Sequence, residues 1–116
     1  MALHFTPAEF ARRRETLLAA MQDGRLDALF LFQQESMFWL TGYDTFGFCF
    51  FQCLVVKADG TMALLTRSAD LRQAQQTSNL TDIRVWKDGR DADPSADLLA
   101  LTRDLGLAGK RIGVEF

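Results

Sequence analysis

Apolar and polar residues at the start of the chain recur with the spacing of an amphipathic helix. Thr6 precedes Pro7, and Glu9 stands three positions after Thr6, which is the pattern of a capping box with proline at the first helical position. We expect this helix to begin after Thr6 and to end at Gly24. The residues that would share its apolar face are Phe10, Leu17, Leu18 and Met21.

Continuous apolar runs later in the chain predict strands. The first run, 26–32, is typical of a strand that is covered on both faces. The segment 48–66 contains two apolar runs joined by a turn at 58–60, and this is the strongest hairpin signal in the chain. Two further strands are expected at 82–87 and 110–116.

Three further helices are expected between these strands. The first covers 35–42, and the second covers 68–77 with Ser68 as its cap. The third runs from the Asp-Pro pair at 93–94 to Gly106. The predicted buried side of this third helix consists of Leu98, Leu99, Leu101, Thr102 and Leu105.

This order of elements predicts an α/β fold. Helices between strands favour a layered architecture, and the hairpin requires at least one antiparallel pair of strands. We therefore expect a mixed sheet of about five strands flanked by helices. With 116 residues the chain has the length of a single domain.

Charge and composition exclude several classes of partner. The formal net charge is −2 and the isoelectric point is near 5.3, so no electrostatic footprint indicates nucleic acid or an anionic membrane. The basic run 12–14 lies within the first helix and is interpreted as a solvated helix face. The first residues lack the pattern of a signal peptide, and no apolar run approaches the length of a membrane span. A cytoplasmic protein is the default expectation.

Few residues offer catalytic chemistry. His4 is the only histidine, so a nucleophile–histidine–acid arrangement is not expected. Cys49 and Cys53 are predicted to share one face of a strand. Their separation along the strand would be about 13 Å, which is too far for a disulfide. We therefore interpret them as reduced cysteines in the core or in a pocket. No glycine motif has the spacing of a phosphate-binding loop. The residues alone indicate neither a catalytic site nor a metal site.

An aromatic stretch is the most unusual feature of the sequence. Residues 36–53 contain five of the ten Phe, together with Trp39 and Tyr43. Asp44 stands within this stretch. It is either a residue that forms a turn or a carboxylate aimed at a polar or cationic group of a ligand at the mouth of the aromatic patch.

Several short motifs, taken in order, resemble a known family. These are Asp27-Ala28 before an apolar strand, the sequence Leu-Thr-Gly-Tyr at 40–43, the Asp-Gly turn at 59–60 and the helix start at 67–72. In this order the chain resembles the N-terminal domain of the creatinase/prolidase/aminopeptidase P family, over nearly all 116 residues. Ser36 stands where the family often has Asn, and Trp39 stands where Tyr is usual. The sequence Trp-Leu-Thr-Gly-Tyr-Asp resembles that of a subgroup that includes ectoine hydrolase-like proteins and prolidase-like peptidases.

The resemblance implies a creatinase N-terminal, ribonuclease H-like layer over 1–116 and a function shared with a second domain. Family members hydrolyse C–N bonds, often of Xaa-Pro peptides. Their pita-bread catalytic domain, expected to be absent from this chain, binds two divalent metal ions, such as Mn or Co, through two Asp, one His and two Glu. This chain would be non-catalytic, would shape the entrance for a peptide or small amide substrate, and would support a homodimer. Carried over by position, the substrate-binding residues would be Tyr43, Asp44, Phe46 and Phe48.

Two other functions remain open at this stage. The chain is alternatively a protein-interaction module of a family member that has lost its metal ligands. The second alternative is a free-standing domain that binds a small molecule through the aromatic turn. The residues that follow position 116 in the parent protein would distinguish the first of these from an active enzyme.

Overall fold

The computed structural model describes residues 3–115, except for the side chain of Phe48. Helices and strands alternate along it, as predicted. The elements are α1 (Pro7–Asp23), β1 (Ala28–Leu31), α2 (Gln34–Thr41), the 3₁₀ helix η1 (Gly47–Cys49), β2 (Cys53–Lys57), β3 (Met62–Arg67), the 3₁₀ helix η2 (Ser68–Asp70), α3 (Leu71–Thr77), β4 (Ile83–Trp86), α4 (Pro94–Asp104) and β5 (Ile112–Val114).

The strands form one mixed sheet in the order β4-β3-β2-β1-β5. The pairs β1–β2 and β2–β3 are antiparallel, whereas β1–β5 and β3–β4 are parallel. Phe30 lies on β1, an interior strand between β2 and β5, opposite Val55 of β2 and Val114 of β5. The predicted mixed five-stranded sheet is therefore confirmed.

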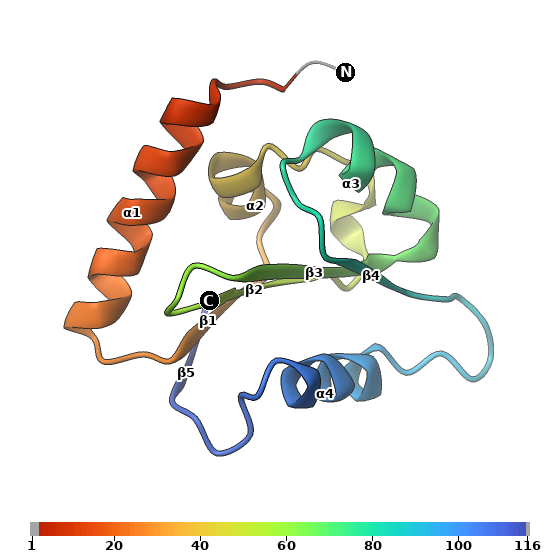
Figure 1. Cartoon of the computed structure of the whole chain (residues 1–116). Helices are drawn as coiled ribbons and strands as arrows, with labels where there is room; N and C mark the ends of the chain where they lie inside the picture. The colour runs from red at the N-terminus through yellow and green to blue at the C-terminus, as the bar shows by residue number, and fades with distance from the viewer. Residues whose placement is uncertain (1–2, 116) are drawn as a thin grey trace.

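Helices cover both faces of the sheet (Figure 1). α1, α2 and α3 lie on one face, where Met21, Met37 and Ala74 pack with the sheet residues Leu54 and Leu64. α4 covers the other face. The buried core on that side comprises Ala28, Phe30, Cys53, Val55, Ala63, Leu65, Trp86, Leu101 and Leu107.

The first helix begins and ends as predicted. Thr6 accepts a hydrogen bond from the Glu9 backbone N–H at its side chain, which confirms the cap. Gly24 is the C-cap residue, as predicted, with a φ of −81°, and the left-handed position that follows belongs to Arg25 (φ 57°). The backbone N–H of Leu26 donates to Met21 O, which closes the turn in a Schellman arrangement.

Three local predictions are wrong. The first hairpin arm begins at Cys53 rather than at residue 48, because Gly47–Cys49 forms the 3₁₀ helix η1. Ser68 makes no cap, since it lies inside η2 and Arg67 occupies the cap position without a side-chain bond. Leu99 is 49% exposed, because it points away from the sheet on the outer face of α4.

Within residues 3–115, no helix combines the length and the apolar composition needed to cross a bilayer.

Candidate functional site

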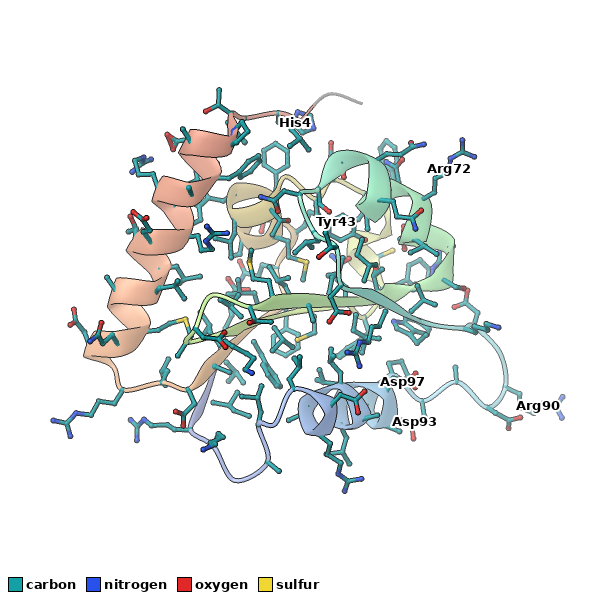
Figure 2. The ribbon with its side chains drawn as sticks, viewed as in Figure 1. His4, Tyr43, Arg72, Arg90, Asp93 and Asp97 are labelled. Carbon is teal, nitrogen blue, oxygen red and sulfur yellow. The ribbon has the colours of Figure 1, made fainter. Side chains whose placement is uncertain are left out.

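The aromatic loop, defined here as residues 43–51, leaves the C-terminus of α2 at Gly42. Its first residue, Tyr43, is fully buried. Figure 2 shows Tyr43 within the molecule, on the side of the sheet that carries α2 and α3. The Tyr43 hydroxyl and Thr66 Oγ1 share a hydrogen bond of 2.9 Å, and burial raises the pKa of the Tyr43 hydroxyl above its ordinary value. Tyr43 therefore supports the loop from the core and presents no surface of its own.

A second anchor holds the loop two residues further on. Thr45 Oγ1 donates a 2.6 Å hydrogen bond to Asp70 Oδ1 and accepts a 3.0 Å bond from the Gly47 backbone N–H. Asp70 Oδ2 lies 3.6 Å from Arg67 Nε. Since Thr45 and Asp70 are both buried, this polar group fixes the path of the loop across η2.

Asp44 and Phe46 are the predicted site residues that the loop exposes. The Asp44 backbone N–H donates to Thr77 Oγ1 at 2.9 Å, and the Asp44 carboxylate reaches solvent 3.7 Å from His4 Nε2. Phe46 is 90% exposed. Phe48 lies in η1, and its side chain is outside the described residues. The structure thus separates the predicted set into a buried support, Tyr43, and two surface residues.

Arg67, the last residue of β3, contacts the outer part of the aromatic loop. The guanidinium of Arg67 lies 3.7 Å from the centre of the Phe50 ring, and Arg67 Nη1 lies 3.7 Å from Asp88 Oδ2. Arg67 and Asp70 escaped the sequence reasoning as site residues. Their i, i+3 spacing at a helix start is a weak signal, and their contacts to the loop join residues far apart in the chain.

A pocket of about 440 Å³ lies beside Asp44. The N-terminal arm, residues 3–6, forms its outer side: the Phe5 ring packs edge-on against Phe38 at 5.6 Å, and the His4 ring lies 4.9 Å from Phe38. Figure 2 shows His4 at the end of the molecule where the arm leaves α1. The residues that line the pocket are Phe5, Arg13, Gln34, Glu35, Phe38, Trp39 and Asp44.

Other hollows lie away from the aromatic loop. One of them, about 640 Å³, lies between the C-terminal half of α1 and the start of β1, and Leu18, Arg25 and Asp27 are among its residues. A third hollow of about 400 Å³ lies in the loop before α4. Figure 2 shows Asp93 and Asp97 there, on the opposite side of the sheet from Tyr43. Among the side chains of the aromatic loop that the structure describes, none lines either hollow.

The two cysteines occupy different environments, which corrects the prediction that they share a strand face. Cys49 is exposed in η1, whereas Cys53 is buried at the start of β2. The cause is the 3₁₀ turn, which removes Cys49 from the strand. Burial raises the pKa of the Cys53 thiol to about 12.

We expect iodoacetamide at about pH 8 to alkylate Cys49 in the folded protein and to leave Cys53 unmodified, because the thiolate is the nucleophile and only Cys49 is accessible. Peptide mass spectrometry measures the two sites, and denatured protein, in which both should react, is the control. The pKa of the Cys53 thiol is higher in the folded protein than its ordinary 9.0. The contribution of the buried neutral thiol to the free energy of unfolding is therefore fully present below pH 9 and is lost as the pH rises towards 12. Equal labelling of the two thiols in the folded protein would contradict the assignment.

The aromatic loop lies within a stretch of sequence that matches a known domain. The sequence model of the Creatinase/Prolidase N-terminal domain matches residues 13–116. The chain belongs to this family. The N-terminal arm and the first turn and a half of α1 precede the matched region of this creatinase/prolidase N-terminal domain.

Two curated relatives share about a third of their residues with the domain over the aligned region. An uncharacterized hydrolase/peptidase, y4tM, of Sinorhizobium fredii is 34% identical over 84 residues, which is 72% of this chain and 21% of the relative. Ectoine hydrolase of Halomonas elongata is 31% identical over 77 residues, 66% of this chain and 19% of the relative. The chain therefore spans about a fifth of the length of these relatives.

Solved structures show the same fold at low sequence identity. The N-terminal domain of an Xaa-Pro dipeptidase from Lactobacillus brevis has a TM-score of 0.76 at 14% identity, covering 89% of this chain and 75% of that one. A dipeptidase from Pyrococcus horikoshii OT3 has a TM-score of 0.71 at 24% identity, covering 89% of this chain and 28% of that one. At these identities the likeness establishes the architecture of the domain.

Proposed function

We propose that this domain is the non-catalytic N-terminal part of a hydrolase of the Xaa-Pro peptidase/creatinase type, in which it forms a wall of the substrate entrance and supports a homodimer. The observation that carries the proposal is the construction of the aromatic loop. Tyr43 and Thr45 hold its base in the core, while Phe46 stays 90% exposed. A large exposed ring on an anchored loop is suited to contact another surface.

The hydrolytic chemistry belongs, in this proposal, to a catalytic domain of the same parent protein. Two divalent metal ions, such as Mn²⁺ or Co²⁺, would activate water and polarise the scissile carbonyl there. The present residues do not fit such a pair of ions, because no three His, Cys, Asp or Glu side chains within residues 3–115 are grouped closely enough to hold a metal. The substrates would be peptides or small amides in the cytoplasm.

Asp44 and Phe46 are the residues proposed to contact the substrate. In the full-length parent protein loaded with Mn²⁺, Phe46→Ala is expected to lower kcat/KM for an Xaa-Pro dipeptide or an N-acylated amino acid by about tenfold, because a substrate contact is lost.

Asp44→Ala is expected to change the preference among substrates while the free energy of unfolding stays within about 1 kcal/mol of the wild type. Initial rates over a substrate panel measure both effects.

Leu99→Ala is the matched control, because Leu99 is an exposed apolar residue on α4, across the sheet from the aromatic loop. Its kcat/KM should equal that of the wild type. The proposal fails if the full-length protein hydrolyses none of these substrates, or if the 116-residue chain alone shows turnover. It also fails if Phe46→Ala and Leu99→Ala have the same effect.

A second candidate function is a protein-interaction module. The exposure of Phe46 also suits a protein partner that would cover the ring. The two functions differ in the parent protein: an interaction module would lack metal ligands in its second domain, and Phe46→Ala would weaken partner binding without any change in hydrolysis.

A further inference from the structure

The pocket beside Asp44 combines aromatic rings with carboxylates. Phe5, Phe38 and Trp39 supply the rings, and Glu35 and Asp44 supply the carboxylates. Trp39 is exposed over 41% of its surface, although it is one of the largest apolar side chains. This pairing of ring faces with negative charge is the chemistry that recognises organic cations.

The arginine in the pocket does not balance this negative charge. Arg13 Nε lies 3.1 Å from Glu9 Oε2, and Arg13 Nη1 donates a 2.8 Å hydrogen bond to the Trp39 backbone oxygen. Its side chain is only 12% exposed, so the guanidinium is enclosed and held by these two partners, of which Glu9 also pairs with Arg12. The Arg13 guanidinium also lies 4.0 Å from the centre of the Phe5 ring and 5.5 Å from that of Trp39, so these rings already contact a cation.

The carboxylate of Glu35 has the opposite character. Glu35 is exposed, and within residues 3–115 it forms neither a salt bridge nor a side-chain hydrogen bond. It lines this pocket and also the adjoining apolar hollow of about 470 Å³, which Leu17 and Leu31 help to form. Trp39 is likewise common to both hollows. An unpaired negative charge thus stands at the junction of two largely apolar surfaces.

We propose that this pocket binds an alkylammonium group, with the apolar stem of the ligand against Trp39 and its ammonium group between Glu35 and Asp44. The charges favour a cation: two carboxylates line the pocket, and its guanidinium is hydrogen-bonded to the Trp39 backbone and paired with Glu9, which it shares with Arg12. Asp44 also faces the imidazole of His4, at 3.7 Å, so Glu35 is the carboxylate that carries the argument. The apolar lining requires a stem, which a bare inorganic cation lacks. This inference is independent of the proposed role in hydrolysis, because it concerns binding to this chain alone. The Phe5 side of the pocket also precedes the family match at residues 13–116.

The test is a titration of the 116-residue chain with n-butylammonium chloride, followed by the NMR signal of the Trp39 indole N–H. The Trp86 indole N–H is an internal reference, because it is buried and donates to Phe51 O at 3.0 Å. We expect a saturable shift of the Trp39 signal alone. The neutral analogue n-butanol, which keeps the stem and lacks the charge, is expected to cause a much smaller shift.

Variants separate the two parts of the pocket. Glu35→Gln is expected to weaken binding about two- to fivefold, the effect of one exposed charge pair. Trp39→Leu is expected to weaken it by about threefold or more through loss of the ring, with the backbone amide signals around the pocket as the readout. Glu15→Gln is the matched control: Glu15 is exposed on α1 and lines a different hollow, so binding should be unchanged.

Three ligands distinguish the source of the ammonium group. n-Butylammonium represents a free amine, Nα-acetyl-lysine methylamide represents a lysine side chain, and alanyl-alanine represents a peptide N-terminus. Binding of any of the three supports the proposal, and the one that binds most tightly identifies the class of ligand. Equal shifts with n-butanol and n-butylammonium would overturn the proposal. So would an effect of Glu15→Gln equal to that of Glu35→Gln. A Trp39 signal that moves with protein concentration and not with amine would show instead that a second copy covers the pocket.

Discussion

Phe30→Ala is expected to lower the free energy of unfolding by about 3–5 kcal/mol, because it leaves a cavity in a packed core. Phe30 is buried on β1, the strand between β2 and β5, and it belongs to the core on the α4 side of the sheet. The rigid strand on either side prevents the backbone from closing the space that the ring leaves. Urea unfolding followed by circular dichroism measures the change.

Phe46→Ala is the control for this substitution, because the same atoms are removed from a ring that is 90% exposed. Its free energy of unfolding is expected to change by no more than about 0.5 kcal/mol. A loss for Phe30→Ala below about 1 kcal/mol would contradict the burial of Phe30 in the core on the α4 side of the sheet, since typical core truncations of this size cost far more. The comparison also shows that Phe46 can be altered in functional tests without unfolding the domain.

Gly42→Ala is expected to lower the free energy of unfolding by about 3 kcal/mol, from left-handed strain and overpacking together. Gly42 ends α2 with a φ of 84° and leads directly into the aromatic loop. A Cβ atom at this position would lie 2.8 Å from Thr77 O and 3.1 Å from Phe10 Cζ. The backbone carbonyl of Thr77 cannot move aside without displacing the end of α3, so the clash is not relieved by a simple rotation.

Gly24→Ala is the matched control for this glycine. Gly24 has a φ of −81°, and its added Cβ would have its nearest neighbour at 3.6 Å, an ordinary contact. The free energy of unfolding is expected to be unchanged or raised by up to about 1 kcal/mol, because alanine restricts the unfolded chain. Similar losses for the two variants in chemical denaturation would show that the left-handed turn at Gly42 is not what holds the start of the loop.

Local patterns predicted most of the fold. The cap at Thr6, the end of α2 at Gly42 and the turn between β2 and β3 depend on residues a few positions apart, and the structure confirms them. The predicted strand from residue 48 failed because an apolar run is compatible with either an extended chain or a 3₁₀ turn. The hydrogen bond between Thr45 and Asp70, which is long-range, helps to hold the chain in the second conformation.

The candidate site was predicted less completely than the fold. The sequence located the aromatic loop, but the ring of Tyr43 turned out to be buried and Phe46 exposed, although both are aromatic residues of the same turn. The Tyr43 ring faces inward because its hydroxyl meets Thr66 on β3, which lies 23 residues later in the chain. The pocket beside Asp44 was not foreseen, since it requires the N-terminal arm to lie across α2.

The amino-acid sequence alone determined the order of helices and strands, the mixed sheet and the position of the aromatic loop, because periodicity, caps and turns act between near neighbours in the chain. Only the tertiary structure decided which aromatic residues support the loop, which reach solvent, and that Glu35, beside Trp39, has no ion-pair partner among residues 3–115. These properties depend on contacts between residues distant in sequence, such as Thr45 with Asp70 and Arg13 with Trp39. Burial and charge pairing are set when those segments meet, and no local pattern records them.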